Sequence, residues 1–237
     1  MGRTTPNTCL LAVLLAVLMV VPLAGSAQAS APPPQQCRSL EGCYSHAQMR
    51  EFYGQVVNLV EGFAQTISGL PRPRYAYVAS GQAVPIACGG AADSTAFFYC
   101  QRDDTIYIGQ DQLWDFYSRT GDGGAAFGVA HEWGHYVQDR TGVLARLSGD
   151  DRALRVRTEN QADCIGGAFL GHARDRGILE EDDYDDVGTI LPLIAAAEAD
   201  LMRDHGTLAE RLQAVRHGLS GGLSACNAYF PDTPLVT

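Results

Sequence analysis

The sequence predicts an α+β fold, in which a small β-sheet is followed by mostly helices. Three short segments rich in aromatic and β-branched residues, at 75–79, 96–100 and 105–109, are separated by Gly and Asp, as strands of a small sheet would be. Apolar residues recur at helical spacing before these segments and again after them. The composition, 46% hydrophobic and 19% charged over 237 residues, is that of an ordinary globular protein. Strands gathered in one part of the chain and helices in the rest are typical of the α+β class.

The first residues have the pattern of a signal peptide, which we expect to span residues 1–29. An apolar stretch at 9–23 follows a single arginine, and Ala27-Gln28-Ala29 offers small residues for cleavage. The alternative is an uncleaved membrane anchor, but this stretch is shorter than the roughly 20 residues that span a bilayer. Residues 30–36 contain three successive prolines and are expected to form an extended linker, followed by a single folded domain over 37–237. We therefore expect a secreted or otherwise extracytoplasmic protein, which meets a membrane only if its leader is retained.

The charge and the cysteine content limit which binding partners and which cell compartment the sequence predicts. Asp and Glu number 27 against 17 Lys and Arg, a net charge of -10, which disfavours nucleic acid as a partner because its phosphates require a basic surface. Six cysteines follow the predicted leader, an even number in an exported chain, so disulfides are expected. Six cysteines allow 15 pairings and the sequence alone does not choose among them, although Cys88 and Cys100 bracket a predicted hairpin and could join it. Oligomeric state is left open by the sequence.

The first predicted helix begins after Ser45, which can cap it together with Gln48 three residues on. Apolar residues then recur at helical spacing until Gly69, which predicts a helix that packs on the core. Beyond the strands, a helical segment at 111–117 is expected to end in a flexible loop at 120–124, because three of these five loop residues are glycine.

The next predicted helix carries the sequence His131-Glu132-Trp133-Gly134-His135. Two histidines four residues apart project from one face of a helix, about a turn from each other, and can bind one Zn²⁺ ion. Glu132 lies beside that face and can take a proton from a zinc-bound water, so it is the candidate general base for peptide hydrolysis. The pentapeptide also occurs by chance on solvated helices, and a third ligand is therefore needed to support the interpretation.

Three further helices are expected after this one. The first spans 158–175, and the second spans 185–204 and is interrupted by Pro192. The third opens with the capping box Thr207-Leu208-Ala209-Glu210 and is expected to end near Gly218.

Glu159 is the candidate third ligand, since catalytic zinc normally has three protein ligands. It lies on the 158–175 helix, where Glu159 and Asp163 share one face. Asp163 could then hold the second ring nitrogen of either motif histidine. The alternatives are a solvated carboxylate pair, or His172 or His205 as the third ligand. Apolar neighbours of Asp163 imply that part of this helix is buried, which favours Glu159.

At this point the chain resembles a known group, because HEWGH followed by ExxxD is similar to the gluzincin arrangement of thermolysin-like peptidases. A closer resemblance, over roughly residues 85 to 230, is to the bacterial family of neutral zinc metallopeptidases. It rests on motifs in the same order: Phe98-Tyr99-Cys100, Thr105-Ile106-Tyr107-Ile108, HEWGHYVQ, Glu159-Asn160-Gln161-Ala162-Asp163-Cys164, and His205-Gly206-Thr207 with Arg211. This sequence departs from the family at Trp133 and Tyr136, where a small aliphatic residue and a second histidine are common, so substrate fit is less well predicted than metal binding.

The resemblance implies a zincin-like, minimal gluzincin domain with Zn²⁺ as its cofactor. Its ligands would be His131, His135 and Glu159, with Glu132 catalytic and Asp163 supporting a ligand. The resemblance also implies that Cys88 pairs with Cys100, and Cys164 with Cys226.

Two further roles follow from resemblance alone. His205 would help to stabilise the tetrahedral oxyanion, whereas the alternative is that His205 sits at a helix boundary and Arg211 pairs with a carboxylate. The strand that contains Tyr107 would be the sheet edge to which an extended peptide substrate adds, whereas the alternative is an ordinary core strand.

The expected function is therefore that of a secreted zinc endopeptidase acting on protein or peptide substrates. The rival hypothesis is a non-catalytic or latent zinc-binding protein of the cell envelope, and Glu132 favours the enzyme because a structural zinc site needs no base. Six acidic residues within 180–186 could attract Ca²⁺, but they lack the regular pattern of a calcium loop, and a solvated acidic helix start is the favoured interpretation. The sequence does not identify the physiological substrate.

Overall fold

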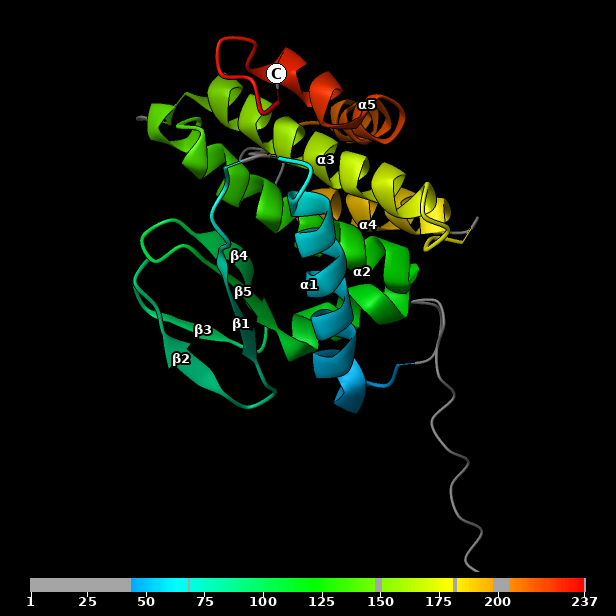
Figure 1. The fold of residues 1–237 in the computed structure, drawn as a ribbon. Helices are drawn as coiled ribbons and strands as arrows, with labels where there is room; N and C mark the ends of the chain where they lie inside the picture. The colour runs from blue at the N-terminus through cyan, green and yellow to red at the C-terminus, as the bar shows by residue number, and fades with distance from the viewer. Residues whose placement is uncertain (1–43, 68, 148–150, 181–182, 198–204, 237) are drawn as a thin grey trace, which may run out of the picture. The chain divides into compact units, whose positions relative to one another are not determined.

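A computed structural model of the chain describes residues 44–67, 69–147, 151–180, 183–197 and 205–236. The expected leader and linker, together with Cys37 and Cys43, lie outside these residues. Among the residues that are described, no helix combines the length and the apolarity needed to cross a membrane. The predicted α+β class is confirmed: a small sheet is followed by long helices (Figure 1).

The sheet has three strands in the order β1-β5-β4, with β5 in the centre. Strand β1 (Arg74–Val78) runs parallel to β5 (Thr105–Gly109), and β4 (Phe97–Cys100) runs antiparallel to it. These are the three segments predicted from their aromatic and β-branched residues. Because β5 has a neighbour on each side, the expectation that the strand of Tyr107 is a sheet edge is wrong. The edges of this sheet are β1 and β4.

A separate antiparallel pair, β2 (Ala83–Pro85) and β3 (Ala91–Asp93), was not predicted. Each strand has only three residues, which is too short to show a reliable alternation. A disulfide from Cys88, between these strands, to Cys100 ties the pair to the end of β4.

Helix α1 (Met49–Ala64) follows a short 3-10 turn (His46–Gln48) and begins where the sequence predicts. The backbone N–H of Ser45 donates to Oε1 of Gln48 over 3.1 Å, which completes the expected capping box. The face that carries Phe52, Val56, Val60 and Phe63 is buried in the main hydrophobic core.

Helix α2 (Gln110–Arg140) contains the predicted motif His131–His135 and replaces the loop expected at 120–124. Only Gly121 departs from helical geometry, with φ 78 and ψ -178, so two helical segments meet at a kink. A Cβ atom at Gly121 would overlap the carboxylate of Asp186. The glycines therefore permit close packing around a kink instead of forming a flexible loop.

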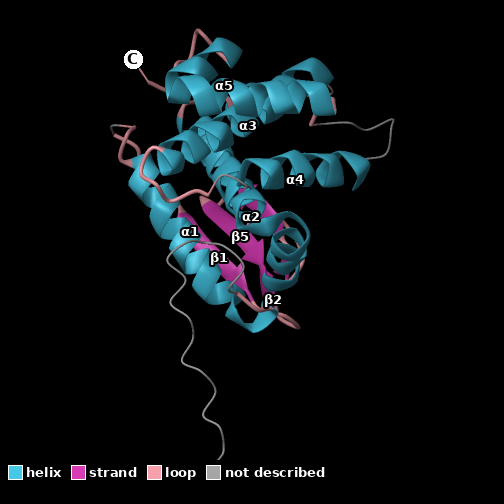
Figure 2. Cartoon of the chain, turned by 90° about the vertical axis from the view of Figure 1, so that its right-hand side faces the viewer, coloured by secondary structure: helices cyan, strands magenta, loops and turns pink. Residues whose placement is uncertain are grey.

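Three helices complete the fold: α3 (Arg152–Arg174), α4 (Asp183–Ala197, with Pro192 inside it) and α5 (Leu208–Cys226). Helix α3 begins before the predicted Thr158, because Asp151 caps it by accepting a hydrogen bond from the Leu154 N–H over 3.0 Å. The end of the predicted 185–204 helix lies outside the described residues. Figures 1 and 2 show α2 between the sheet and the pair α3 and α5, and α2 contacts β4, β5, α3 and α4.

Helix α5 opens with the predicted Thr207 capping box, but it continues past Gly218 to Cys226. A Cβ atom at Gly218 would overlap the carbonyl oxygen of Cys164, so this glycine serves the close approach of α5 to α3 instead of ending a helix. The Cys164–Cys226 disulfide joins the same two helices. Both disulfide pairings implied by the family resemblance are therefore present.

Candidate metal centre

Three side chains from α2 and α3 bring possible metal-binding atoms together. His131 and His135 project from α2 with their ring centroids 4.7 Å apart. Oε2 of Glu159, on α3, lies 3.3 Å from Nε2 of His131 and 3.5 Å from Nε2 of His135. These three residues form a group whose ligand atoms lie within 4.8 Å of one another.

This donor set fits a zinc ion in both geometry and chemistry. Two ligands at about 2.0–2.1 Å from a tetrahedral Zn²⁺ lie roughly 3.3 Å apart, close to the separations found here. Oε2 of Glu159 is buried and has no hydrogen-bond partner among the described residues. A buried carboxylate oxygen that makes no well-aligned hydrogen bond favours a positive charge beside it, either on a protonated imidazole or on a metal ion. Two imidazoles and one carboxylate also form a typical protein ligand set of catalytic zinc.

Asp163 holds the second ring nitrogen of His131, at 2.9 Å from Nδ1. Arg211 on α5 in turn forms a bidentate pair with Asp163, with Nε 2.7 Å from Oδ2 and Nη2 2.8 Å from Oδ1. Asp163 and Arg211 are both fully buried. Arg211 therefore pairs with a carboxylate, as the alternative interpretation of this residue expected. That carboxylate, Asp163, supports a histidine of the candidate metal centre.

Gln138 holds the second ring nitrogen of His135, as Asp163 holds that of His131. The sequence analysis did not identify Gln138. Oε1 of Gln138 lies 2.9 Å from Nδ1 of His135. The Gln138 amide is itself fixed, because its Nε2 donates to the Thr158 carbonyl over 2.6 Å and to Oε1 of Gln161 over 3.1 Å. The position three residues after His135 on the same helix is a signal that could have identified it.

The carboxylates make this centre strongly attractive to a cation. Burial alone would lower the pKa of His131, but its contacts with Asp163 and Glu159 outweigh burial and raise that pKa to about 10. Burial would raise the pKa of Glu159, but the two motif histidines hold it well below its usual range. The site therefore keeps its carboxylates ionised and favours positive charge between them.

Glu132 lies on the same helix and is buried beside the two histidines. Burial raises the pKa of its carboxyl group above the ordinary value. Its Oε2 accepts a hydrogen bond of 2.9 Å from the backbone N–H of Tyr99. Since Tyr99 belongs to β4, an edge strand of the sheet runs directly past the candidate base.

Of the two other histidines considered as ligands, one lies at the centre and one does not. Nε2 of His205 lies 3.3 Å from Oε2 of Glu159, although His205 is not in the compact three-donor group. His172 instead contacts the Phe63 ring and Arg176, more than three helical turns along α3 from Glu159.

Comparison with known proteins identifies the family to which this chain belongs. A family model described as "putative neutral zinc metallopeptidase" matches residues 8–229. The chain belongs to this family. An uncharacterized protein of Mycobacterium tuberculosis is 37% identical over 114 residues, which cover 45% of this chain and 38% of that protein. The uncharacterized protein YpfJ of Escherichia coli is 28% identical over 163 residues, covering 60% of this chain and 57% of its own length. The chain thus spans about two fifths to three fifths of these relatives. No solved structure matches.

The two departures from the metallopeptidase family pattern lie in the core and away from the three-donor group. Trp133 is fully buried and packs on Phe63, with ring centroids 5.5 Å apart. Tyr136 is also buried, and its hydroxyl donates to the carbonyl of Pro71. Both side chains therefore serve packing between α2 and the segments around α1.

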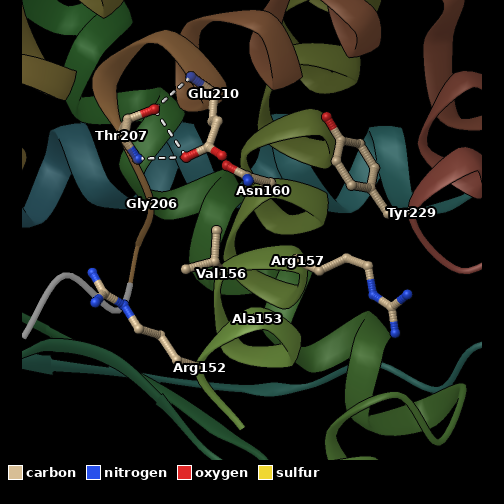
Figure 3. A pocket seen from close by; sticks show the side chains of 9 residues that line it. All are labelled: Arg152, Ala153, Val156, Arg157, Asn160, Gly206, Thr207, Glu210 and Tyr229. Atoms are coloured by element: carbon tan, nitrogen blue, oxygen red, sulfur yellow. Dashed lines mark hydrogen bonds between the residues drawn. The ribbon is translucent and has the colours of Figure 1, made fainter.

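A pocket of about 620 Å³ adjoins this candidate metal centre (Figure 3). Its lining includes Asn160 and Gly206, the direct sequence neighbours of Glu159 and His205. Oδ1 of Asn160 is buried without a hydrogen-bond partner among the described residues. Arg152 and Arg157 of α3 line the same pocket, as Figure 3 shows.

Proposed function

We propose that this protein is an exported zinc-dependent endopeptidase. The observation that carries the proposal is the convergence of His131, His135 and Glu159 on one point, with the Glu132 carboxylate buried beside it. A purely structural zinc site would have a fourth protein ligand and no use for a carboxylic base. Membership of the neutral zinc metallopeptidase family supports the same reading.

In the proposed peptide hydrolysis, the metal ion and the protein side chains each supply part of the chemistry. When bound, Zn²⁺ lowers the pKa of a coordinated water and polarises a peptide carbonyl. Glu132 takes the proton of the attacking water and later passes it to the leaving amine. Asp163 and Gln138 keep the two imidazoles oriented through their Nδ1 atoms.

The edge strand β4 is the proposed platform for substrate. It is paired on one side only within the described sheet, and its Tyr99 N–H reaches Glu132. An extended peptide that adds to such an edge gains backbone hydrogen bonds with little demand on sequence. His205, beside Glu159, is proposed to donate a hydrogen bond to the oxyanion that forms during attack.

Export is proposed from two features. The sequence begins with the pattern of a cleavable leader. The structure has two disulfides, which persist in oxidising compartments.

Zinc content and casein hydrolysis, measured on the mature protein and on Glu132→Gln, test the proposal. Loss of the base should reduce turnover by about 10²- to 10⁴-fold while one zinc per chain is retained. Glu51→Gln, an exposed residue in the first turn of α1, is the matched control and should behave as wild type. His205→Ala should lower kcat with little loss of zinc.

Two results would count against the proposal in different ways. Zinc in wild type and Glu132→Gln with no hydrolysis by either would favour a latent or non-catalytic zinc protein. A folded wild type that binds no zinc would refute the ligand assignment itself.

A further inference from the structure

A second group of carboxylates lies where the kink of α2 meets the start of α4. Oxygen atoms of Asp122, Glu180 and Asp183 lie within 4.8 Å of one another. Asp122 follows the kinked Gly121, whereas Asp183 opens α4, so the group joins two helices that are about 60 residues apart in sequence. It shares no residue with the zinc centre, and the inference below does not rest on the proposed function.

Two of these three residues are buried, and two of the three carboxylates each have one buried oxygen that lacks a donor in the described part of the chain. Asp122 and Asp183 are each only 2% exposed. Oδ2 of Asp122 and Oε2 of Glu180 are buried with no hydrogen-bond partner among the described residues. The favoured interpretation of the acidic run, a solvated helix start, is therefore wrong for Asp183. Residues 181 and 182 of that run lie outside the described residues.

The backbone is shaped to bring the acids together. A Cβ atom at Gly121 would overlap the carboxylate of Asp186, and one at Gly123 would lie 2.8 Å from Asp183 Oδ1. The single N–H of Gly123 donates both to Oδ1 of Asp122 over 3.0 Å and to Oδ2 of Asp186 over 3.2 Å. A fourth carboxylate, that of Asp186, thus lies next to the three.

The hydrogen-bond donors found here among the described residues leave part of the negative charge of these carboxylates unpaired. The start of α4 and the renewed helix after Gly121 offer partial positive charge. Besides the N–H of Gly123, the N–H of Glu180 donates to Oδ2 of Asp183 over 2.7 Å. Even so, burial and the neighbouring Asp183 raise the pKa of Asp122 to about 8. Either a proton or a cation has to lie between these groups at neutral pH.

We propose that Asp122, Glu180 and Asp183, with Asp186 beside them, form a binding site for one Ca²⁺ ion. All the ligand atoms are carboxylate oxygens, which are the donors of hard cations, and neither His nor Cys takes part. Opposite ligands of Ca²⁺ lie about 5 Å apart for bonds of 2.3–2.6 Å, which accommodates the 4.8 Å spread of these oxygens. The ion would clamp the start of α4 to the helix that carries His131.

Thermal unfolding and calorimetric titration with CaCl₂ test this site. The protein carries one Zn²⁺ per chain in calcium-free buffer, and NaCl keeps the ionic strength constant. At about 100 times Kd, one bound Ca²⁺ should raise the Tm of wild type by roughly 5–10 °C. Asp122→Asn should lose most of this shift and the calorimetric heat, without loss of zinc.

Two further variants keep the test decisive if Asp122→Asn folds poorly. Glu180→Gln alters a less buried ligand and should also lose most of the shift. Asp185→Asn removes the same charge from the same turn of α4, but at an exposed position outside the group, and should keep the full shift. A wild type whose Tm does not respond to 10 mM CaCl₂ would overturn the proposal and indicate a pair that shares a proton only. A shift that both Asp122→Asn and Glu180→Gln retain would overturn it as well.

Discussion

Replacing Arg211 with methionine removes the cation that faces Asp163 in the core. Arg211 is 1% exposed, and both oxygens of Asp163 accept from its guanidinium at 2.7 and 2.8 Å. Breaking a buried pair by removing one partner costs about 3–5 kcal/mol, and here the Asp163 carboxylate would lose both guanidinium hydrogen bonds while keeping its contact with His131. For a domain of this size that corresponds to a fall in Tm of roughly 10 °C.

The double variant Asp163→Leu/Arg211→Met separates stability from metal binding. Exchanging a whole buried ion pair for apolar side chains is often close to neutral, so the double variant should recover most of the lost stability. His131 nevertheless loses the acceptor for its Nδ1, and zinc affinity should remain about 10- to 100-fold weaker. Stability is measured by thermal and urea unfolding of metal-free protein with its disulfides intact, and zinc affinity by competition with a chromogenic chelator.

The same pair predicts a pH dependence. Burial alone would raise the pKa of Asp163, but Arg211 outweighs burial and lowers it below the ordinary 3.8. A lowered folded-state pKa contributes stability above pH 3.8 that is lost as the pH falls further. The advantage of wild type over Arg211→Met should therefore shrink as the medium becomes acidic. If Arg211→Met costs less than about 1 kcal/mol at pH 7 and binds zinc as wild type does, the coupling inferred here does not exist.

Two other predictions concern residues that the structure alone singles out. Gln138→Leu should weaken zinc affinity about 10-fold, because Nδ1 of the second motif histidine loses its partner, and an unchanged affinity in the chelator assay would contradict this. Gly218→Ala should lower the free energy of unfolding by about 1–3 kcal/mol, because the new Cβ would overlap the carbonyl of Cys164. Gly54→Ala, on an exposed part of α1 with open space around it, should instead raise it by about 0.4–1 kcal/mol, and thermal unfolding of both variants would show whether the signs differ.

Features set by local spacing could be predicted from the sequence. Two histidines four residues apart share a helix face wherever that helix lies, so His131 and His135 could be paired without a structure. The capping boxes at Ser45 and Thr207 are equally local, because each is completed within three residues. The three main strands were found because aromatic and β-branched residues are concentrated in them.

Glycine was the least informative local signal. At Gly121 and Gly218 the sequence indicated a loop and a helix end, but the structure has a kink and a close helix contact. The absence of a side chain permits both a turn and a tight approach, and only the neighbouring element determines which occurs. Those neighbours, Asp186 and Cys164, are more than 50 residues away in sequence.

Contacts between distant segments were decided by tertiary structure alone. The sequence proposed that Asp163 supports one of two histidines, and packing of α3 on α2 selects His131. It could not indicate that Arg211 neutralises Asp163, nor that Asp122 joins the acids that open α4, because no local pattern relates groups about 50 or 60 residues apart. Helix periodicity fixes which residues share a face, whereas the charge that a buried group meets depends on which other face is packed against it.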